Sequence, residues 1–441
     1  MHPEMPTPRP NGRALIPFLV FALFYVGLSI QANDFYKVPM PIAFLVASAT
    51  ALFMGRKRKL ADKIETYAVS MGNPSIMIMC LIFILSGAFA SVAKGMGAVD
   101  AAVNIAQCLI PGNLMLAGIF LVSALISLSI GTSCGTIAAL VPIAAGLVVP
   151  LRIAPSLMIG AVVSGAMFGD NLSMISDTTI AATRTQNIPM REKFIANIRI
   201  VLPVAGLSLL LYAFLGHGNA PLPESTVGWD DLILVLPYIL ILVLALLGLN
   251  VMFLLFSGTL LAGIIGILLH RFGFWDSLDL IGKGTLGMSE TLIVALLAGG
   301  LLGLIRHNGG ILWLMEKIGK RVKGPRGCEL GVLLLVSAVN LFTANNTVAI
   351  IIAGPLARSL SERFGCKPER IASILDTGSC VIQGIIPYGA QLLMAISLTK
   401  AAGIALSPLP LIQALYYQAF LVVAVLLSIL FSKSSKLQRR A

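Results

Sequence analysis

The sequence predicts an all-α integral membrane protein built from inverted repeats, with interrupted helices or re-entrant hairpins. Of the 441 residues, 57% are hydrophobic and 11% are charged, whereas a soluble domain carries about 25% charged residues. The apolar runs approach the ~20 residues that a helix needs to cross a bilayer, and no alternating strand pattern accompanies them. Because a helix satisfies its own backbone hydrogen bonds in lipid, helices are the expected spanning elements.

The apolar runs predict about 12–14 membrane segments. In chain order, the expected segments are 14–30, 39–54, 75–93, 113–130, 131–150, 155–182, 196–215, 231–249, 250–269, 285–305, 328–342, 343–357, 371–397 and 411–431. Two of them, 131–150 and 343–357, begin with polar or glycine-rich sequence and contain a proline. We expect these two to be broken crossings or re-entrant hairpins, and the loop charge favours broken crossings.

Two stretches of the first half resemble two stretches of the second half. LVSALISLSIGTSCGT (121–136) aligns with LVSAVNLFTANNTVAI (335–350) at an offset of 214 residues. APSLMIGAVVSGAMFGDNLSMISDTT (154–179) aligns with KPERIASILDTGSCVIQGIIPYGAQL (367–392) at an offset of 213. Each half has an apolar helix, a small polar stretch, a proline and a helix interrupted by polar residues, an order that predicts an internal repeat.

The basic loops change sides between the two halves. The linker 94–112 carries one basic residue, whereas its counterpart 306–326 carries six. The linker 183–199 carries four, whereas its counterpart 397–410 carries one. By the positive-inside rule the repeats are therefore inverted in the membrane, and both termini are expected in the cytoplasm. Inverted repeats with interrupted helices are typical of secondary transporters, whose site lies near the midplane between the repeats.

This pattern divides the chain into five parts. We expect N-terminal helices with two membrane spans over 1–70, a first repeat over 71–215, a linker with connecting spans over 216–284, a second, inverted repeat over 285–432 and a basic cytoplasmic tail over 433–441. The polar stretch 214–232 is expected to be an external linker. No separate soluble domain is predicted.

The formal net charge of +12 does not indicate a nucleic-acid partner. Basic residues cluster in short loops such as 55–63 and 316–327, as positive-inside topology produces. The expected partners are the lipid bilayer and the transported solutes, and a homodimer is compatible with the pattern. The six cysteines form no C-x-x-C pair and the four histidines are scattered, so no disulfide framework, zinc site or cofactor is expected.

Four polar clusters interrupt the apolar sequence. They are GTSCGT (131–136), FGDNLSMISDTT (168–179), TANNT (343–347) and LDTGSCVIQGIIPYGAQ (375–391). Asp170, Asp177 and Asp376 are the strongest functional signals, because a charge at bilayer depth costs roughly 2.5–3.5 kcal/mol and persists only where it faces a bundle interior or a wet cavity. A hard cation prefers oxygen ligands. We therefore expect these three carboxylates to bind Na⁺.

Hydroxyl and amide side chains of the same clusters are expected to complete the binding shell. The candidates for ion or substrate binding are Thr132, Ser133, Thr136, Asp170, Asn171, Ser173, Ser176, Asp177, Thr178, Asn345, Asn346, Thr347, Asp376, Thr377, Ser379 and Gln383. A carboxylate in a low-dielectric site can hold either a proton or a cation, which is the minimal chemistry of an exchanger. At the offset of 213, Asp170 pairs with Gln383, so the site is expected to be asymmetric.

Several candidates also have a structural interpretation. Asp177 precedes two threonines and fits a helix N-cap. The small residues of GTSCGT could serve close helix packing. In the first alignment, Asn345 and Asn346 pair with Gly131 and Thr132, and the two amides could form a structural hydrogen-bond network.

Some of these features also occur in two classes of enzyme and in a second class of transporter. Residues 131–135 match G-x-S-x-G, but the strand–turn–helix context of a nucleophile elbow is missing. An intramembrane aspartyl protease needs G-x-G-D, whereas the chain has AMFGD, so we expect no enzyme activity. The main alternative is a Na⁺- or H⁺-coupled carrier of a small organic solute, such as an amino acid or a carboxylate. Gln383, Gln391, Asn345 and Asn346 could bind that solute.

GTSCGT followed by GAMFGDNLSMISDTT resembles the NhaC-type Na⁺/H⁺ antiporter family, whose members show GTSWGT-like and FGDxxSPxSDTT-like stretches. The fourth cluster resembles the family's EDSGT…IPW region at Asp376, Gly378 and Pro387. The chain departs from the family pattern at Asn345, where members often have an acidic residue, and at Met174, where a proline is usual.

The resemblance implies an inner-membrane secondary transporter that exchanges Na⁺ for H⁺. Carried over position by position, the residues that line its site are Asp170, Ser173, Ser176, Asp177 and Thr178, with Asp376 and Thr377 from the other repeat. Na⁺ and H⁺ are then the transported ions, and no cofactor is implied. No G-x-x-x-x-G-K-[ST] motif is present, so we expect ion gradients rather than ATP to drive transport.

Overall fold

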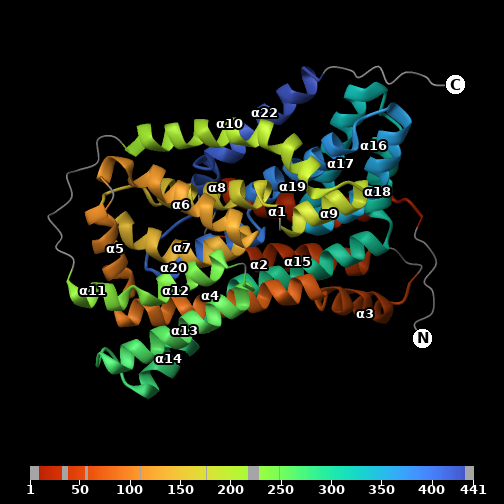
Figure 1. Ribbon diagram of the computed structural model, residues 1–441. Helices are drawn as coiled ribbons and strands as arrows, with labels where there is room; N and C mark the ends of the chain where they lie inside the picture. The colour runs from red at the N-terminus through yellow and green to blue at the C-terminus, as the bar shows by residue number, and fades with distance from the viewer. Residues whose placement is uncertain are drawn as a thin grey trace.

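The computed structural model describes residues 9–31, 38–54, 58–109, 111–174, 176–216, 228–247 and 249–432. The described chain is helical throughout, with no strand among these residues (Figure 1). Nine helical stretches are long and apolar enough to cross a membrane, and three shorter apolar helices accompany them in the same part of the chain. The expected tail 433–441 and most of the expected linker 214–232 lie outside the described residues.

The helices follow one another with short connections. In chain order they are η1 (Gly12–Leu15), α1 (Ile16–Gln31), α2 (Met40–Phe53), α3 (Leu60–Met71), α4 (Pro74–Met96), α5 (Ala98–Leu109), η2 (Gly112–Leu114), α6 (Met115–Ile130), α7 (Ser133–Val148), α8 (Pro155–Leu172), α9 (Asp177–Gln186), α10 (Met190–Gly216), α11 (Trp229–Leu234), α12 (Leu236–Leu246), α13 (Val251–Leu268), α14 (Phe274–Gly287), α15 (Ser289–His307), α16 (Gly310–Gly319), α17 (Gly324–Thr343), α18 (Asn346–Phe364), α19 (Pro368–Ile385), α20 (Ala390–Ala401), α21 (Pro408–Gln413) and α22 (Tyr416–Leu430).

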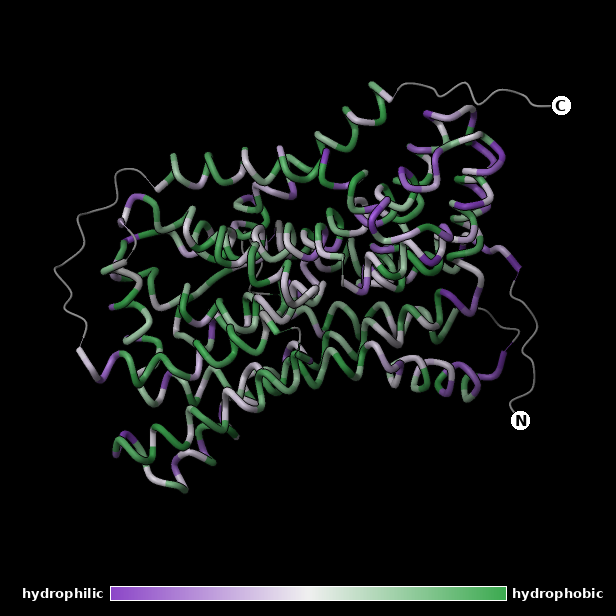
Figure 2. Tube along the Cα trace, in the orientation of Figure 1, coloured by the Kyte–Doolittle hydropathy of each residue, from purple (hydrophilic) through white to green (hydrophobic). Residues whose placement is uncertain are grey.

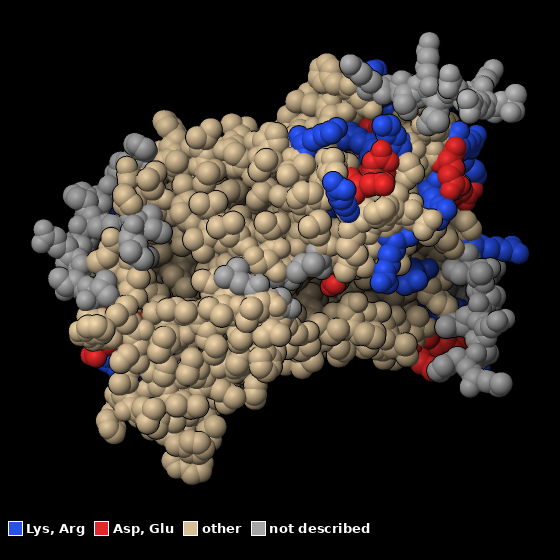
Figure 3. Space-filling model, viewed as in Figure 1, with Lys and Arg blue, Asp and Glu red and all other residues tan. Residues whose placement is uncertain are grey.

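The outer surface is apolar over most of its length. On α10 and α13, Phe214, Phe253 and Leu268 are 73%, 54% and 70% exposed, and the outer helices are predominantly hydrophobic (Figure 2). Charged residues gather at the end of the molecule that carries α16, and the middle of the same face is almost free of them (Figure 3). Soluble proteins rarely expose a continuous apolar surface of this size, so lipid is the medium that this surface fits.

Both described ends of the chain lie at the end that carries α16, here called the basic end. The backbone N–H of Asn11 donates to the carbonyl of Gly309 at 3.1 Å. The hydroxyl of Ser432 donates to Glu329, near the start of α17, at 3.0 Å. At the opposite end, Lys94 at the close of α4 donates to the carbonyl of Ala401 at 3.2 Å. The two described ends of the chain therefore lie at the same end of the molecule.

The segments α6–α7 and α17–α18 are two re-entrant hairpins. The far end of α7 packs on α5, which leads directly into α6. Likewise Cys366, just after α18, contacts the carbonyl of Pro325 at the start of α17. The hairpins thus enter from opposite ends, and their tips meet in the middle of the molecule. The prediction of broken crossings from the loop charge is therefore wrong. A hairpin and a pair of full crossings both return the chain to the side on which it entered, so the charge of the flanking loops cannot distinguish them.

The helix caps correct the sequence alignment of the hairpin tips by one residue. Gly131 ends α6 and Ala344 ends α17, both in the left-handed conformation. Thr132 and Asn345 are the N-caps of α7 and α18. Thr132 therefore corresponds to Asn345 at an offset of 213, whereas the alignment had paired Gly131 with Asn345. The sequence match at the tips is weak, so the apolar residues that precede the tips set the register of the alignment.

Equivalent hydrogen bonds recur at the same offset of 213 in both halves. Ser127 of α6 donates to the carbonyl of Ala166 in α8. Asn340 of α17 donates to the carbonyl of Ser379 in α19 at 2.7 Å. In each half, this bond attaches the hairpin to a crossing segment, α8–α9 or α19–α20, that is itself interrupted after its first helix. Four helix ends are thereby brought to the centre of the molecule.

Candidate functional site

Asp170 lies at the tip of the first hairpin. It belongs to the last turn of α8, is 5% exposed, and accepts two hydrogen bonds from Ser133. The Ser133 backbone N–H donates at 3.2 Å and its hydroxyl at 2.7 Å, both to Oδ2 of Asp170. Because Ser133 is the first residue of α7, the carboxylate sits at the positive end of a helix dipole, where an anion is stabilised.

A chain of side-chain hydrogen bonds connects Asp170 to the second hairpin. Gln391 Nε2 donates to the Ser133 hydroxyl at 2.9 Å, and Gln391 Oε1 accepts from Gln383 Nε2 at 2.8 Å. Gln383 Nε2 also donates to the carbonyl of Ala344, at the second hairpin tip, at 3.0 Å. Both amide hydrogens of Gln383 are used, so the orientation of this amide is fixed. The two hairpin tips are therefore joined through Asp170, Ser133, Gln391 and Gln383.

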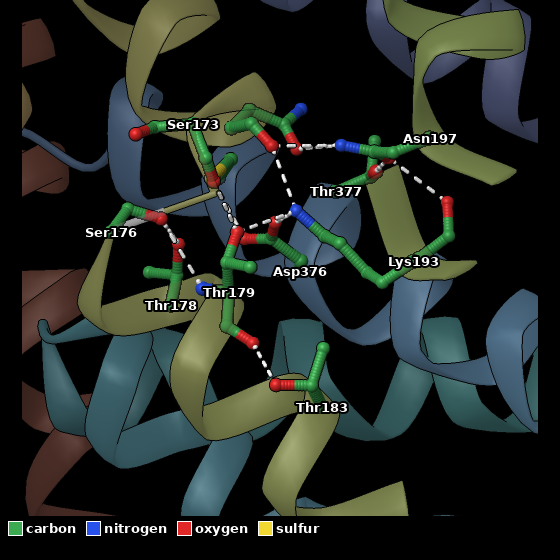
Figure 4. Close-up of polar contacts among 12 residues, drawn as sticks. Ser173, Ser176, Thr178, Thr179, Thr183, Lys193, Asn197, Asp376 and Thr377 are labelled. Atoms are coloured by element: carbon green, nitrogen blue, oxygen red, sulfur yellow. Dashed lines mark hydrogen bonds and ion pairs between the residues drawn. The ribbon is translucent and has the colours of Figure 1, made fainter. Parts of the chain in front are cut away.

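Asp376 forms a buried ion pair with Lys193 (Figure 4). The two side chains are 0% and 1% exposed. Lys193 Nζ also donates to the backbone carbonyl of Asn171 at 2.9 Å and to the hydroxyl of Thr179 at 2.7 Å. The ammonium of Lys193 thus makes two hydrogen bonds and one ion pair.

Asn197 joins the two halves one helical turn after Lys193. Its Nδ2 donates to Asn171 at the backbone carbonyl, 2.8 Å away, and at the side-chain oxygen, 2.9 Å away. Its Oδ1 accepts from the hydroxyls of Ser373 and Thr377 of α19 at 2.9 and 2.8 Å. Asn171, from the first half, and Thr377, from the second, are thus held by one amide.

Hydroxyl side chains at the interruption between α8 and α9 form local hydrogen bonds that stabilise the break. Ser176 is the N-cap of α9 and accepts from the backbone N–H of Thr179 at 3.2 Å. Its hydroxyl also bonds that of Thr178, at 3.0 Å. Ser173 donates to the carbonyl of Leu128 at 2.9 Å. Asp177 is the first residue of α9 and is exposed, so the N-cap predicted for it falls one residue earlier.

The other predicted residues lie around the hairpin tips and on α19. Asn345 caps α18 by accepting from the backbone N–H of Val348 at 3.0 Å. Asn346 accepts from the backbone N–H of Thr347 at 3.1 Å, while the side chain of Thr347 is half-buried. Thr132 is half-buried and its carbonyl accepts from the hydroxyl of Thr136 at 3.1 Å.

Some buried polar atoms near these tips have no hydrogen-bond partner among the described residues. They are Asn346 Nδ2, Gln383 Oε1 and Asn340 Oδ1. Ser379, on the same helix as Gln383, donates to the carbonyl of Asp376 at 2.8 Å. Unpaired buried oxygens are costly, and they leave free ligand positions next to the second hairpin tip.

The three carboxylates predicted as one Na⁺ site are not brought together. Asp170 bonds Ser133, Asp376 pairs with Lys193, and Asp177 is exposed. No group of three or more His, Cys, Asp or Glu side chains that could hold a metal ion occurs within the described ranges. A joint three-carboxylate site is therefore not supported.

Sequence reasoning missed Lys193 and Asn197 as members of the core. It counted Lys193 among the basic residues of the loop 183–199, whereas the residue is buried on α10. A signal was present, because the buried face of α10 runs through Lys193, Asn197, Val201, Ser208 and Tyr212. That spacing places the two polar residues on the apolar face of a helix.

Two cavities of similar volume open toward opposite ends of the molecule. The one at the basic end has a volume of about 800 Å³ and runs between α3, α15 and α18 from Arg58 and Arg306 to Asn345. The one at the opposite end, about 820 Å³, runs between α4, α7 and α20, and on α7 it ends at Pro142. Pro142 lies about ten residues beyond the tip at Thr132, or roughly 15 Å of helix. Of these two cavities, as lined by the described residues, the first reaches a hairpin tip and the second does not.

Comparison with known proteins gives a consistent result. The model of the "Na+/H+ antiporter family" matches residues 14–217 and 232–430. The Na⁺/H⁺ antiporter NhaC of Bacillus subtilis is 26% identical over 432 residues, covering 89% of this chain and 91% of that protein. The malate-2H⁺/Na⁺-lactate antiporter of the same organism is 20% identical, covering 85% and 86%. Among solved structures, the YdaH transporter of Alcanivorax borkumensis matches with a TM-score of 0.44 at 15% identity, covering 94% and 97%.

Proposed function

The chain belongs to the Na⁺/H⁺ antiporter family, and from this premise we propose that it is a secondary active transporter that exchanges Na⁺ for H⁺ across the cell membrane. The basic end then faces the cytoplasm, with both termini on that side. The observation that carries the proposal is Asp170, a buried carboxylate at a helix N-terminus where two hairpin tips meet.

In this proposal Na⁺ and H⁺ compete for the carboxylate of Asp170. A carboxylate can hold a proton or act as an oxygen ligand of a hard cation, but one oxygen cannot do both. The donors from Ser133 stabilise the anionic form between the two occupied states. The family match favours this exchange over a carrier of an organic solute.

The hydrogen-bond chain supplies a physical link between occupancy and conformation. Asp170 accepts from Ser133, which in turn accepts from Gln391. Placing a proton or a cation on Asp170 changes what Ser133 can donate to, so it affects both hairpin tips through Gln391 and Gln383. The cavity that reaches Asn345 supports access from the basic end in this conformation.

The contacts of Ser133 argue against the protease alternative. Its partners in the described chain are Asp170 and Gln391, and no described histidine contacts its hydroxyl. A nucleophilic serine needs an adjacent general base that is in turn oriented by a third group.

Transport by purified protein in proteoliposomes tests the proposal. Addition of Na⁺ outside acid-loaded vesicles is expected to raise the internal pH, measured with a trapped pH dye. Asp170→Asn should abolish the exchange while leaving the protein folded, because it removes the exchangeable charge and keeps the shape. Asp279→Asn, which changes an exposed carboxylate of α14, is the matched control and should exchange at the wild-type rate. Wild-type exchange by Asp170→Asn would exclude Asp170 from the mechanism.

A further inference from the structure

The buried charges at the centre of the molecule are few and can be counted. The charged side chains buried in the described chain are Lys63, Asp170, Lys193, Glu329 and Asp376. Lys63 donates to the carbonyls at the end of α2, and Glu329 pairs with Arg370 near the basic end. The buried charges at the centre are therefore two carboxylates and one ammonium, and the exposed carboxylate of Asp177 lies at the start of α9.

Lys193 is held in place by groups from both halves. Its ammonium donates to the Asn171 carbonyl at the end of α8 and to the Thr179 hydroxyl on α9. The same ammonium forms the ion pair with the Asp376 carboxylate on α19. Asp376 is fully buried, and a buried carboxylate needs a neutralising partner. The ammonium of Lys193 supplies that positive charge in place of a free cation.

Asp170 has no such counter-ion. Its contacts in the described structure are the neutral donors of Ser133, and its counterpart in the second half, Gln383, is uncharged. The buried charges at the centre consequently sum to one negative charge when Asp170 holds no ion, and to zero when Asp170 holds either Na⁺ or H⁺.

We propose that Lys193 is a permanent counter-ion that stays paired with Asp376 throughout the cycle, leaving Asp170 as the single exchangeable buried carboxylate. The exchange is then one Na⁺ for one H⁺ and moves no net charge. This inference rests on the proposed function, because it takes Na⁺ and H⁺ as the transported ions. Lys193 acts here by holding Asp376, not by touching the transported ion.

Proteoliposomes with a clamped membrane potential test the charge balance. The potential is set with K⁺ gradients and valinomycin, and the Na⁺ and pH gradients at which net exchange stops are measured. For the wild type, net exchange is expected to stop when the Na⁺ concentration ratio equals the H⁺ concentration ratio, whatever the membrane potential. If one uncompensated charge moved per cycle, ~100 mV would shift that point about 50-fold in ion ratio.

Two variants separate the role of Lys193 from mere structural support. Lys193→Met should leave Asp376 without its cation, so that Asp376 takes up an ion and the stopping point becomes dependent on potential, or exchange is lost. Lys193→Met combined with Asp376→Asn restores the original charge count and should recover electroneutral exchange. Lys320→Met, which changes an exposed lysine at the end of α16, is the control and should match the wild type.

The outcomes distinguish this inference from the proposed function. Absence of Na⁺-driven proton movement in the wild type overturns the proposed function itself. Wild-type exchange with a potential-dependent stopping point overturns only the role of Lys193. Unchanged electroneutral exchange by Lys193→Met does the same, as does a folded double variant that recovers no exchange.

Discussion

At the scale of single residues, the position of Asp170 depends on the glycine beside it. A Cβ atom at Gly169 would lie 2.5 Å from the carbonyl oxygen of Ala124 and 2.5 Å from the Cβ of Ser127. Only glycine lets α8 approach α6 this closely, and the approach brings Asp170 to the start of α7. The sequence motif F-G-D thus contains both the carboxylate and the residue that allows it to reach Ser133.

Replacing Gly169 by alanine should therefore destabilise the protein and abolish exchange. The added methyl group meets backbone atoms that cannot move freely, and overpacking of this kind costs about 1–3 kcal/mol. The measurement is the thermal unfolding midpoint in detergent together with the exchange rate. Gly263→Ala is the matched control, since no atom lies within 4 Å of the added Cβ, and its midpoint should stay the same or rise. Equal midpoints for the two variants would contradict this account.

At the scale of elements, the two hairpins share a turn but differ in the residue that makes it. Gly131 has φ +73° and Ala344 has φ +46°, both in the left-handed region. That region costs a residue with a Cβ about 1–2 kcal/mol, whereas glycine adopts it freely. The second hairpin therefore carries strain at its tip that the first avoids, at the carbonyl that accepts from Gln383.

Reciprocal substitutions at the two tips should shift stability in opposite directions. Ala344→Gly is expected to raise the free energy of unfolding by up to about 1 kcal/mol, less the entropy that glycine loses on folding. Gly131→Ala is expected to lower it by about 1–2 kcal/mol. Chemical denaturation in detergent, with each variant compared with the wild type, measures both signs. A loss of stability in both variants would show that the tips are not equivalent turns.

At the scale of the whole molecule, the two cavities lie in equivalent grooves and differ in depth. At the basic end, Asn345, Val348 and Ile352 line the cavity along α18. At the opposite end, the cavity touches α7 only from Pro142 onward. Because α7 and α18 correspond at an offset of 213, the same groove is open to the tip in one half and closed in the other. This asymmetry is what a transporter open toward one side would have.

Cysteine labelling at equivalent positions can test that asymmetry. In a cysteine-free background, Ile352→Cys should react with a membrane-impermeant maleimide added at the cytoplasmic face, because it lines the open cavity. Its counterpart, Ala139→Cys, replaces a residue that is 5% exposed and should be protected in the same conformation. Reaction rates are read from the mass shift of the labelled protein in inside-out vesicles. Equal labelling of both positions would contradict one-sided access.

The sequence by itself determined the class of the protein and its most informative stretch. Composition and apolar runs were sufficient to predict an all-helical membrane protein, because transfer of side chains into lipid depends on local sequence. The exchange of basic loops between the two halves was sufficient to predict an inverted repeat. The motif F-G-D was sufficient to predict a carboxylate at a helix end. The offset of 213 between Asp170 and Gln383 also held, because apolar helices of equal length flank both positions.

Only the tertiary structure decided what each charge is paired with. Lys193 and Asp376 lie 183 residues apart, and their contact depends on how α10 packs against α19, which no local pattern contains. The same packing leaves Asp177 exposed, whereas Asp170 and Asp376 are buried. The sequence could not distinguish hairpins from pairs of full crossings, because both leave the flanking loops on the same side of the membrane. Local physics fixed the elements, and long-range packing fixed which of their polar groups meet.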